Sequence, residues 1–409
     1  MLALTAGAAC SDGATTTATT NPAIASTTTT HIDDGALVIG AILPSSGAAA
    51  ELGASMAAGL SLALAEINDA GGINGRPVRL ITRDEGDNPT TTALAMQEVV
   101  QSVDAIIGPT SSTNALGTLG IAVDAGILTC SPTASALALD EYPDDGLFFR
   151  TIPSDSLQAT AIASVVEASG GSTAVVVYLD DAFGRPFADA TRSAISAGGT
   201  TVTQFIGFIP TAESIADAVR AAADAAPDVI AVIADSINGP AIINAIDAEA
   251  GPAVTYVVND AIRRPAASAQ PFPARLARRV VGVAPLALSG SAAYTESLLA
   301  VDPTTTGLFA HNAYDCLSIL ALAAAASDST QPSSIASAVS AVTSSGTGCD
   351  NYTECIVALE EGRNINYNGP SGNLSIGSDG NIATANFERF RFDATGRDVS
   401  DGEVAVGNG

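Results

Sequence analysis

The sequence contains no lysine and no tryptophan, and all 16 of its basic residues are arginine. Without lysine the chain cannot form the phosphate-binding loop G-x-x-x-x-G-K, a Schiff-base nucleophile or a serine–lysine dyad. It has two histidines, His31 and His311, which are too few for a zinc site of the H-E-x-x-H type. These absences exclude several classes of nucleotide-dependent, covalent and zinc-dependent enzyme.

Positive charge is also scarce, since 43 Asp and Glu residues outnumber the 16 arginines and give a formal net charge of −27. Such an acidic surface repels phosphate groups, so nucleic acid is not expected as a partner. The hydrophobic fraction of 47% is too high for a disordered acidic chain, and the length allows two domains. The missing lysine has two open explanations, which are coding bias and a salty habitat.

The N-terminus indicates an exported protein. Small residues precede Cys10 and resemble the end of a bacterial lipoprotein signal, in which Cys10 would carry the lipid. The apolar run before it is short and contains no basic residue, so a disordered tail with a chance cysteine is the alternative. Residues 1–35 cannot bury a core, and we expect them to form a signal remnant followed by a Thr-rich tether. After this segment the sequence contains no run of about 18 consecutive strongly apolar residues, so no membrane span is predicted.

The other four cysteines fall into two pairs. Cys349 and Cys355 are close in sequence with polar residues between them, which predicts a small disulfide loop in an exported protein. Cys130 and Cys316 lie in apolar segments, and we expect them to be buried free thiols.

From residue 37 onward, short apolar runs alternate with helix-like segments, and the series restarts after Arg150. This alternation predicts an α/β protein with two lobes, each a doubly wound parallel sheet covered on both faces. A further helix is expected over 312–326, and a strand with one exposed face over 386–393. The expected strands of the two series are 37–43, 78–82, 105–107 and 127–129, then 174–179, 202–208, 229–233, 254–258 and 280–283.

Four loops that follow these strands are candidates for ligand binding, because ligands of such sheets lie beyond the carboxyl ends of the strands. Two are rich in hydroxyl groups, 108–113 and 130–135, and two are acidic, 180–184 and 259–260. Hydroxyls and helix N-termini suit a carboxylate, and Asp260 suits an ammonium, so the set fits a zwitterion. Ser, Thr and Asp are also common turn and cap residues, which is the alternative explanation.

Five segments of the sequence carry a recognisable pattern, namely LVIGAILP (37–44), INDAGGING (67–75), IIGPTSS (106–112), ILTCSP (127–132) and FRTIP (149–153). In these segments the chain resembles the periplasmic leucine/isoleucine/valine-binding proteins of ABC importers. This resemblance implies a type I periplasmic-binding fold with two lobes joined by three crossovers, near 150–154, 283–287 and 366–373. Lobe one would be 36–151 plus 286–368, and lobe two 152–285 plus 373–409.

Matching the family's motifs assigns roles to the loop residues. Ser112 corresponds to the serine that binds the α-carboxylate, and its neighbour Thr113 is included with the ligand-binding residues. Thr133 corresponds to the residue whose carbonyl receives the ammonium, and Ser135 keeps the hydroxyl found two positions later. Asp260 corresponds to the acidic residue that holds the ammonium, and it is one methylene shorter than the usual Glu.

The remaining matched positions are apolar and leave the specificity open. Phe183 stands where the family commonly has a tyrosine, and Leu52 where it has an aromatic residue at the rim. Ile237 or Asn238 occupies a second aromatic position. The family's first-lobe disulfide has no counterpart near Asp87. An apolar pocket of this kind favours an aliphatic or otherwise neutral ligand.

The expected function is therefore that of an extracytoplasmic substrate-binding protein of an ABC importer for a branched-chain, aliphatic or other neutral amino acid. It would be a monomer without a cofactor, either anchored by lipid to the outer face of the membrane or periplasmic, and would deliver its ligand to a membrane permease. Two alternatives keep the fold, namely an extracellular sensing receptor and a binder of an amide or urea-like ligand.

Enzyme and metal-binding alternatives are weaker. Ser111, Ser112 and Asp181 could be imagined as a hydrolase site, but no G-x-S-x-G elbow is present, and His311 lies in an apolar helix. A metal site is possible by spacing, although a solvated acidic loop is the better explanation of the same residues, Asp84, Glu85 and Asp87.

Overall fold

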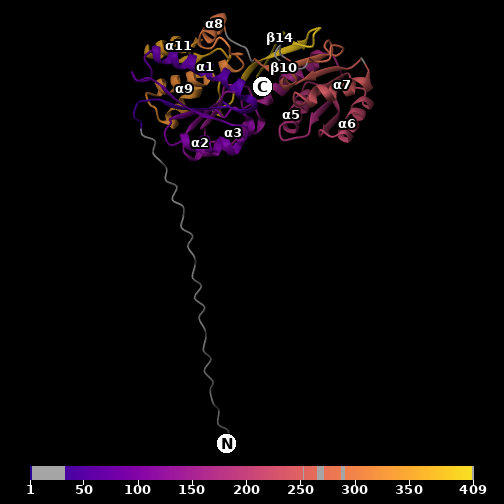
Figure 1. Cartoon of the computed structure of the whole chain (residues 1–409), viewed down its shortest axis with the longest axis horizontal. Helices are drawn as coiled ribbons and strands as arrows, with labels where there is room; N and C mark the ends of the chain where they lie inside the picture. Colours follow the sequence, from indigo (N-terminus) through magenta and orange to yellow (C-terminus); the bar gives the residue numbers. More distant parts are fainter. Residues whose placement is uncertain (2–32, 252, 265–270, 287–290, 408–409) are drawn as a thin grey trace. The chain divides into compact units, whose positions relative to one another are not determined.

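The computed structural model describes Met1 and residues 33–251, 253–264, 271–286 and 291–407 (Figure 1). The expected lipidation site Cys10, His31 and most of the expected tether lie outside the described residues.

Strand β1 (Val38–Leu43) is buried on both faces. Ile39 and Ala41 belong to the apolar cluster that contains residues of helix α1 (Ala50–Asp69), whereas Ile42 belongs to the cluster of helix α2 (Pro89–Val99). Alternate side chains of a strand lie on opposite faces of the sheet. The unbroken apolar run of β1 therefore reflects a strand that is covered on both sides.

The first sheet has five parallel strands with helices on both faces. One face carries α1 with α8 (Ala292–Val301), α9 (Ala310–Ser327), α10 (Pro332–Ser344) and α11 (Tyr352–Glu360), and the other carries α2 and α3 (Ser112–Asp124) (Figure 1). In sheet order the strands are β2 (Arg79–Asp84), β1, β3 (Ala105–Ile107), β4 (Leu128–Ser131) and β5 (Phe148–Arg150).

The second sheet has seven strands and is also covered on both faces. Helices α4 (Asp155–Ala168) and α5 (Gly184–Ala197) pack on one face, and α6 (Ala212–Asp224) and α7 (Asn238–Ala250) on the other. In sheet order the strands are β14 (Asp398–Gly407), β13 (Thr384–Phe392), β10 (Val280–Pro285), β9 (Thr255–Val258), β8 (Val229–Ile233), β6 (Thr173–Leu179) and β7 (Thr201–Phe208).

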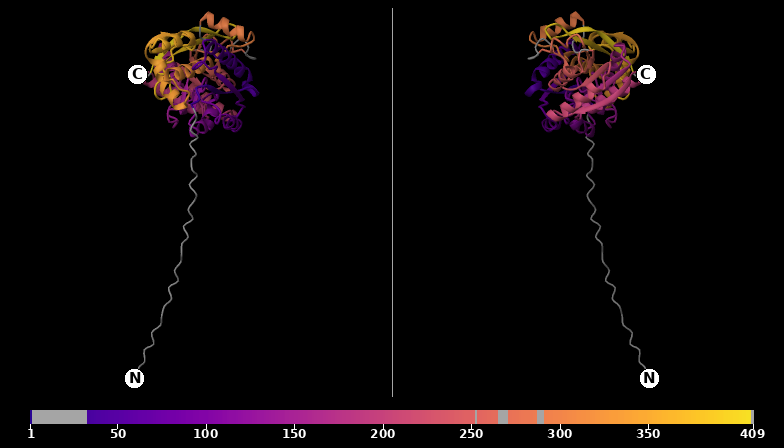
Figure 2. Two further views of the ribbon diagram at one scale, coloured as in Figure 1. Left: turned by 90° about the vertical axis from the view of Figure 1, so that its left-hand side faces the viewer. Right: turned by 90° about the vertical axis from the view of Figure 1, so that its right-hand side faces the viewer.

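The C-terminal strands make this second sheet mixed, because β13 pairs antiparallel with both β10 and β14 (Figure 2). The expected alternation over 386–393 is confirmed. Phe387, Phe390 and Phe392 are buried, whereas Asn386 is exposed and the Arg391 side chain is 42% exposed. Phe387 belongs to one core cluster and Phe390 and Phe392 to the other, so the buried face of the strand changes along its length. Strand β14 forms the more exposed edge of the sheet.

The two sheets thus form the two doubly wound α/β lobes of a type I periplasmic-binding fold, and the chain passes between them three times. The passages lie between β5 and α4, between β10 and α8, and between β12 (Ile365–Tyr367) and β13. Strand β12 pairs with β11 (Thr347–Cys349) in a separate two-stranded sheet. In the third passage, the Ile376 amide donates to Thr343 of α10, and the Gly380 carbonyl accepts from Arg150 of β5. Residues around 376–380 therefore bond to elements of the first sheet.

One helical stretch, Gly47–Asp69, is long and apolar enough to cross a membrane by length and composition. Its main part is α1, and Met56, Leu60 and Ile67 on this helix are fully or almost fully buried in the core cluster. The helix packs against α9 and β1. These contacts explain its apolar character as that of a core helix.

The four cysteines in the described part of the chain form two disulfides. One joins Cys349 of β11 to Cys355 of α11. The other joins Cys130 of β4 to Cys316 of α9, so the expectation of two free thiols at these positions is wrong. Helix α9 packs over β4 and brings the two Cα atoms to 5.9 Å, which is within the usual range for a disulfide.

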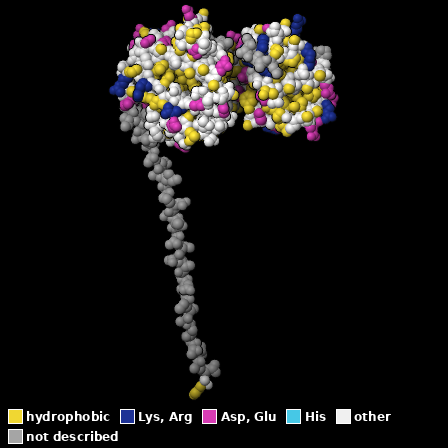
Figure 3. All heavy atoms as spheres, viewed as in Figure 1, with side chains coloured by type: hydrophobic (Ala, Val, Ile, Leu, Met, Phe, Trp, Pro, Cys, Tyr) yellow, Lys and Arg dark blue, Asp and Glu magenta, His cyan; other side chains and the backbone are white. Residues whose placement is uncertain are grey.

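The acidic side chains do not gather in one patch on the face shown in Figure 3, but are scattered among apolar and uncharged groups. This distribution fits a generally acidic outer surface and gives no sign of a single strongly charged docking area on that face.

We expect the Cys130–Cys316 disulfide to stabilise the fold more than the Cys349–Cys355 disulfide, because it closes a loop of 186 rather than 6 residues. On the chain-entropy model, replacing both cysteines by alanine should lower the free energy of unfolding by about 5 kcal/mol for the first pair and about 2 kcal/mol for the second. Urea unfolding of the two double variants measures both losses. Equal losses, or free thiols at Cys130 and Cys316 in denatured, unreduced protein, would contradict this assignment.

Candidate functional site

The two hydroxyl-rich loops follow neighbouring strands of the first sheet. The loop 108–113 follows β3 and runs into α3, whose first residue is Ser112. The loop after β4 contains Thr133 and Ser135. Since β3 and β4 are adjacent and parallel, both loops lie at the same edge of the sheet, with the N-terminus of α3 between them.

The buried carboxylate of Glu85, directly after β2, holds the first of these loops. Its side chain is 1% exposed and accepts hydrogen bonds from Thr110 N at 2.9 Å, Thr110 Oγ1 at 2.6 Å, Ser111 N at 3.0 Å and Asn114 Nδ2 at 2.9 Å. All of these donors belong to the loop or to the first turn of α3. Glu85 therefore positions the loop 108–113 and the start of α3.

The metal alternative at 84, 85 and 87 finds no support in the geometry. The carboxylate of Asp84 accepts from Ser45 N and Ser46 Oγ, which hold its pKa at about 2, while Glu85 bonds to the loop before α3. Among the described residues no group of three or more His, Cys, Asp and Glu side chains could hold a metal ion.

Hydrogen bonds between the two loops hold the predicted serine and threonine together. Ser112 Oγ accepts from Ala136 N at 3.2 Å, and Thr133 Oγ1 donates to Thr110 O at 2.8 Å. Both side chains are partly buried, whereas Thr113 is exposed. The structure thus brings Ser112 and Thr133 into one unit, at the start of a helix whose N–H groups suit a carboxylate.

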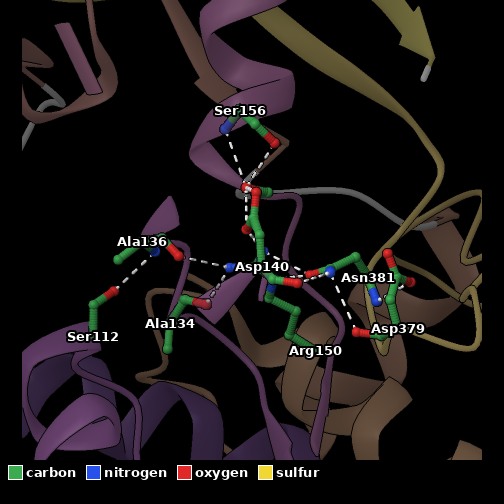
Figure 4. A network of polar contacts seen from close by, with 9 residues as sticks. Ser112, Ala134, Ala136, Asp140, Arg150, Ser156, Asp379 and Asn381 are labelled. Carbon is green, nitrogen blue, oxygen red and sulfur yellow. Dashed lines mark hydrogen bonds and ion pairs between the residues drawn. The ribbon is translucent and has the colours of Figure 1, made fainter. Parts of the chain in front are cut away.

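A buried arginine, Arg150 at the end of β5, connects this unit to the first crossover (Figure 4). Its Nη1 donates to Ala134 O at 3.3 Å and Ala136 O at 3.2 Å, and its Nη2 pairs with Asp140 and donates to Asn381 Oδ1. Asp140 in turn accepts from Ser154 Oγ at 2.7 Å, and Ser154 caps α4. The loop after β4 and the third crossover are therefore bonded directly to one guanidinium, and the first crossover is connected to it through Asp140.

The acidic candidate Asp260 directly follows β9 of the second sheet and begins a short 3-10 turn, Asp260–Ile262. Its Oδ1 accepts from Gln158 Nε2 at 3.0 Å, and the same amide donates to Val283 O at 2.9 Å. Burial raises the pKa of Asp260, although the side chain keeps part of its surface exposed. No basic side chain hydrogen-bonds to this carboxylate within the described part of the chain.

Asp155, the first residue of α4, lies between Ser135 and Asp260. Its backbone N–H donates to Ser135 O at 2.9 Å, and its side chain is 2% exposed. Burial, and next the charge of Asp260, raise the pKa of Asp155 to about 7. Through Asp155 the structure connects the hydroxyl loops of the first sheet to the acidic loop of the second.

The predicted apolar residues Phe183 and Ile237 directly precede helices α5 and α7. Asp181 Oδ1 accepts from Phe183 N at 3.0 Å, and Asp235 Oδ1 accepts from Ile237 N at 2.8 Å, so both helix starts have the same capping geometry. The two apolar side chains are 40% and 78% exposed. Leu52 instead lies in α1 and packs against the core cluster. Among the described residues no hydrogen bond links Phe183 or Ile237 to the hydroxyl loops.

Sequence reasoning missed Asp155 and Gln158. They lie three residues apart on α4, so they share one face of the helix, and both are buried. Their positions continue the apolar stripe of Ala159, Ile162 and Val166, so polar residues at this end of the stripe were a usable signal. The motif FRTIP, which carries part of the family resemblance, ends just before them.

For the hydrolase alternative, no histidine or carboxylate among the described residues is hydrogen-bonded to Ser112. The Ser112 hydroxyl accepts from a backbone amide, and Asp181 caps α5. His311 is 1% exposed, its Nε2 lies 2.9 Å from Leu286 O, and burial lowers its pKa to about 4. Neither side chain is bonded to Ser112.

Comparison with known proteins agrees with this geometry. The model of a family described as periplasmic binding protein matches residues 36–382. The chemotactic signal transduction system substrate-binding protein BasB of Halobacterium salinarum is 29% identical over 83% of each chain. The Leu/Ile/Val-binding protein BraC3 of Rhizobium johnstonii is 31% identical, but over 46% of this chain and 50% of its own length.

Solved structures share the fold at lower identity. The leucine-binding protein LivK of Thermotoga maritima is 17% identical with a TM-score of 0.67, and the alignment covers 90% of this chain and 98% of that one. A solute-binding protein of R. palustris in complex with benzoate is 19% identical with a TM-score of 0.65, and covers 91% and 98%. At this identity the likeness concerns the fold alone.

We expect the Glu85→Gln substitution to lower the free energy of unfolding by about 1–3 kcal/mol, because an amide in place of the carboxylate brings an N–H group against buried donors. Urea unfolding measures the loss. Asp87→Asn, at an exposed position of the same loop, is the control and should change stability by less than about 0.5 kcal/mol. Equal stability of the two variants would show that Glu85 does not hold the loop.

Proposed function

The chain belongs to the periplasmic binding protein family, and we propose that it is the extracytoplasmic substrate-binding protein of an ABC importer for a small neutral amino acid. The observation that carries the ligand class is Asp260, a carboxylate at the carboxyl end of β9. It is held by the Gln158 amide, and no basic side chain among the described residues hydrogen-bonds to it. A site with hydroxyls and a helix N-terminus on one side and a free carboxylate on the other is complementary to a zwitterion.

In this proposal the ligand's two charged groups are bound by different lobes. Ser112 and the first turn of α3 receive the α-carboxylate, with Thr113 beside them. The Thr133 carbonyl, the Ser135 hydroxyl and Asp260 receive the ammonium. Binding is non-covalent and needs no cofactor.

The side chain of the ligand would contact Phe183 and Ile237, with Leu52 near the rim. The exposed apolar surface of Phe183 and Ile237 favours an aliphatic ligand such as leucine, isoleucine or valine. No arginine occupies a proposed ligand position, which disfavours an acidic ligand side chain.

Lobe one is proposed as 36–151 plus 286–368 and lobe two as 152–285 plus 373–409. The bonds of Ile376 and Gly380 to the first sheet's elements favour moving the last boundary toward β13. Closure of the lobes over the ligand would produce the form that the membrane permease recognises. We expect a monomer located outside the cytoplasm, and anchored by lipid if Cys10 is the modified residue.

A sensing role is the second candidate, because BasB is named for chemotactic signal transduction and aligns over most of both chains. Deleting the gene separates the two roles, since loss of amino-acid uptake indicates import and loss of chemotaxis with intact uptake indicates sensing. An amide or urea-like ligand remains a further alternative, and a thermal-shift screen that includes these compounds tests it directly. A ligand at 100 times its dissociation constant adds about 2.7 kcal/mol of stability.

We predict that Asp260→Asn weakens leucine binding by about 2–4 kcal/mol, because it removes the charge that opposes a buried ammonium. Isothermal titration calorimetry measures the change. Glu213→Gln, an exposed acidic residue in the first turn of α6, is the matched control and should bind as the parent protein does. Unchanged affinity in the Asp260 variant would overturn the proposed ligand orientation.

A further inference from the structure

Asp155, which is buried, and Asp260, which is partly buried, form an acidic pair, and among the described residues no basic side chain hydrogen-bonds to either carboxylate. We propose that the ligand's ammonium group is bound by both carboxylates, so that Asp155 is a second acidic ligand-binding residue and the site selects ligands that carry a primary ammonium. This inference rests on the proposed function and adds a residue and a selection rule to it.

An unsatisfied oxygen indicates that something is missing beside Asp155. The side chain is 2% exposed, and its Oδ2 is buried without a hydrogen-bond partner. A buried carboxylate oxygen without a donor is costly, because it has lost its water and gained nothing in return. An ammonium group offers three N–H donors and a positive charge, which is what this oxygen lacks.

The position of Asp155 is fixed by the helix that also holds Asp260. The N–H of Asp155 bonds to Ser135 O, and Gln158, one turn later on α4, bonds to Asp260 Oδ1. The Gln158 amide is itself anchored on Val283 O. The start of α4 therefore lies between the loop of Ser135 and the loop of Asp260, where the ammonium is proposed to bind.

The nearby arginines are committed to other groups. A hydrogen bond from the Ser135 side chain, and next the charge of Arg150, lower the pKa of Asp155. The Arg150 guanidinium itself bonds to Ala134 O, Ala136 O, Asp140 and Asn381. Arg263 lowers the pKa of Asp260, but it pairs with Glu388 and Asp398. The charge of Asp140 adds to the repulsion on Asp155. The pair therefore carries negative charge that the arginines leave uncompensated.

Without a cation, this repulsion is relieved by a proton. Burial and the charge of Asp260 raise the pKa of Asp155 to about 7, so this carboxyl is about half protonated at neutral pH. When a ligand ammonium binds, the carboxylic acid gives its proton to the buffer and the carboxylate pairs with the cation. No other bond changes. Ligand affinity should therefore rise with pH through 7, the reverse of what a site requiring neutral Asp155 would show.

The acidic pair also predicts which ligands are rejected. A carboxylate ligand without an ammonium, such as the benzoate in the R. palustris structure, has no N–H donor for Asp155 and Asp260. It would also bring a third negative charge near these two carboxylates. Leucine and its des-amino analogue 4-methylpentanoate have the same aliphatic part, so their comparison isolates the ammonium.

The experiment is calorimetric titration of the full chain with leucine, 4-methylpentanoate and benzoate, for the parent protein, Asp155→Asn and the control Glu213→Gln. For the parent and the control we expect release of about half a proton per leucine at pH 7, counted from two buffers of different ionisation enthalpy. Their leucine affinity should be about tenfold or more weaker at pH 5.5 than at pH 8. Asp155→Asn should bind leucine about tenfold more weakly at pH 8, and should lose most of the proton release and of the pH dependence.

If Asp155 binds the ligand, Asp155→Asn removes one of two repelling charges and should leave the melting temperature of the free protein unchanged or higher. If Asp155 has a structural role, the same substitution should lower the melting temperature. A lower melting temperature with unchanged affinity overturns the inference, as does tight binding of 4-methylpentanoate or benzoate. If Asp155→Asn fails to fold, the absence of proton release by the parent protein is sufficient to overturn it. Leucine binding without these signatures leaves the proposed function standing, whereas no binding of any amino acid removes both.

Discussion

The buried guanidinium of Arg150 is the constraint on which the binding region depends. The side chain is 0% exposed, and an unpaired charge in such a place would cost many kcal/mol. Its partners come from the loop after β4, from Asp140 and from Asn381 of the third crossover. These segments are far apart in the sequence, and each must be in position before the charge can be buried.

The same network determines where the binding groups lie. Ala136, whose carbonyl accepts from Arg150, donates its own N–H to Ser112, and Asp140 accepts from the residue that caps α4. The carboxylate side of the proposed site and the first turn of α4 are thus held by one set of hydrogen bonds (Figure 4). Any movement of α4 relative to the first sheet has to strain or exchange the bonds between Asp140 and Ser154, so the crossover and the site are mechanically linked.

Local patterns were sufficient to predict most of the strands and the two-lobe fold class. The continuous apolar runs correspond to strands buried on both faces. Asn88 caps α2 by accepting from Thr90 N and Thr91 N, the role that an Asn before a proline commonly has. Pairings between distant segments were not predictable in this way. The Cys130–Cys316 disulfide depends on where α9 crosses β4, 186 residues later. The acidic run at 84–87 looked like one cluster, but Asp84 and Glu85 bond to different loops.

The candidate site residues were likewise predictable where local patterns carry them, and not where they depend on contacts between distant segments. The loops after β3, β4 and β9 could be chosen because the carboxyl ends of parallel strands are the places where ligands bind. The importance of Asp155 and Gln158 comes from contacts with segments more than 100 residues further along, since Gln158 bonds to Asp260 and Val283 across separations of 102 and 125 residues. A helix start gives no local sign of such partners beyond its buried polar residues.

The exposed apolar residues complete the physical account of specificity. Phe183 and Ile237 are held at the starts of α5 and α7 by hydrogen bonds from their own N–H groups to Asp181 and Asp235, so the caps fix the backbone at both positions. The Phe183 ring also contacts the Phe187 ring edge-on. Fully burying a side chain of this size is worth roughly 1.5–3 kcal/mol, and both positions forgo much of that in the free protein. A ligand with an aliphatic side chain would recover part of it. In this proposal the negative charges of Asp155 and Asp260 select ligands that carry an ammonium. Contacts with Phe183 and Ile237 then determine which amino acid binds with the highest affinity.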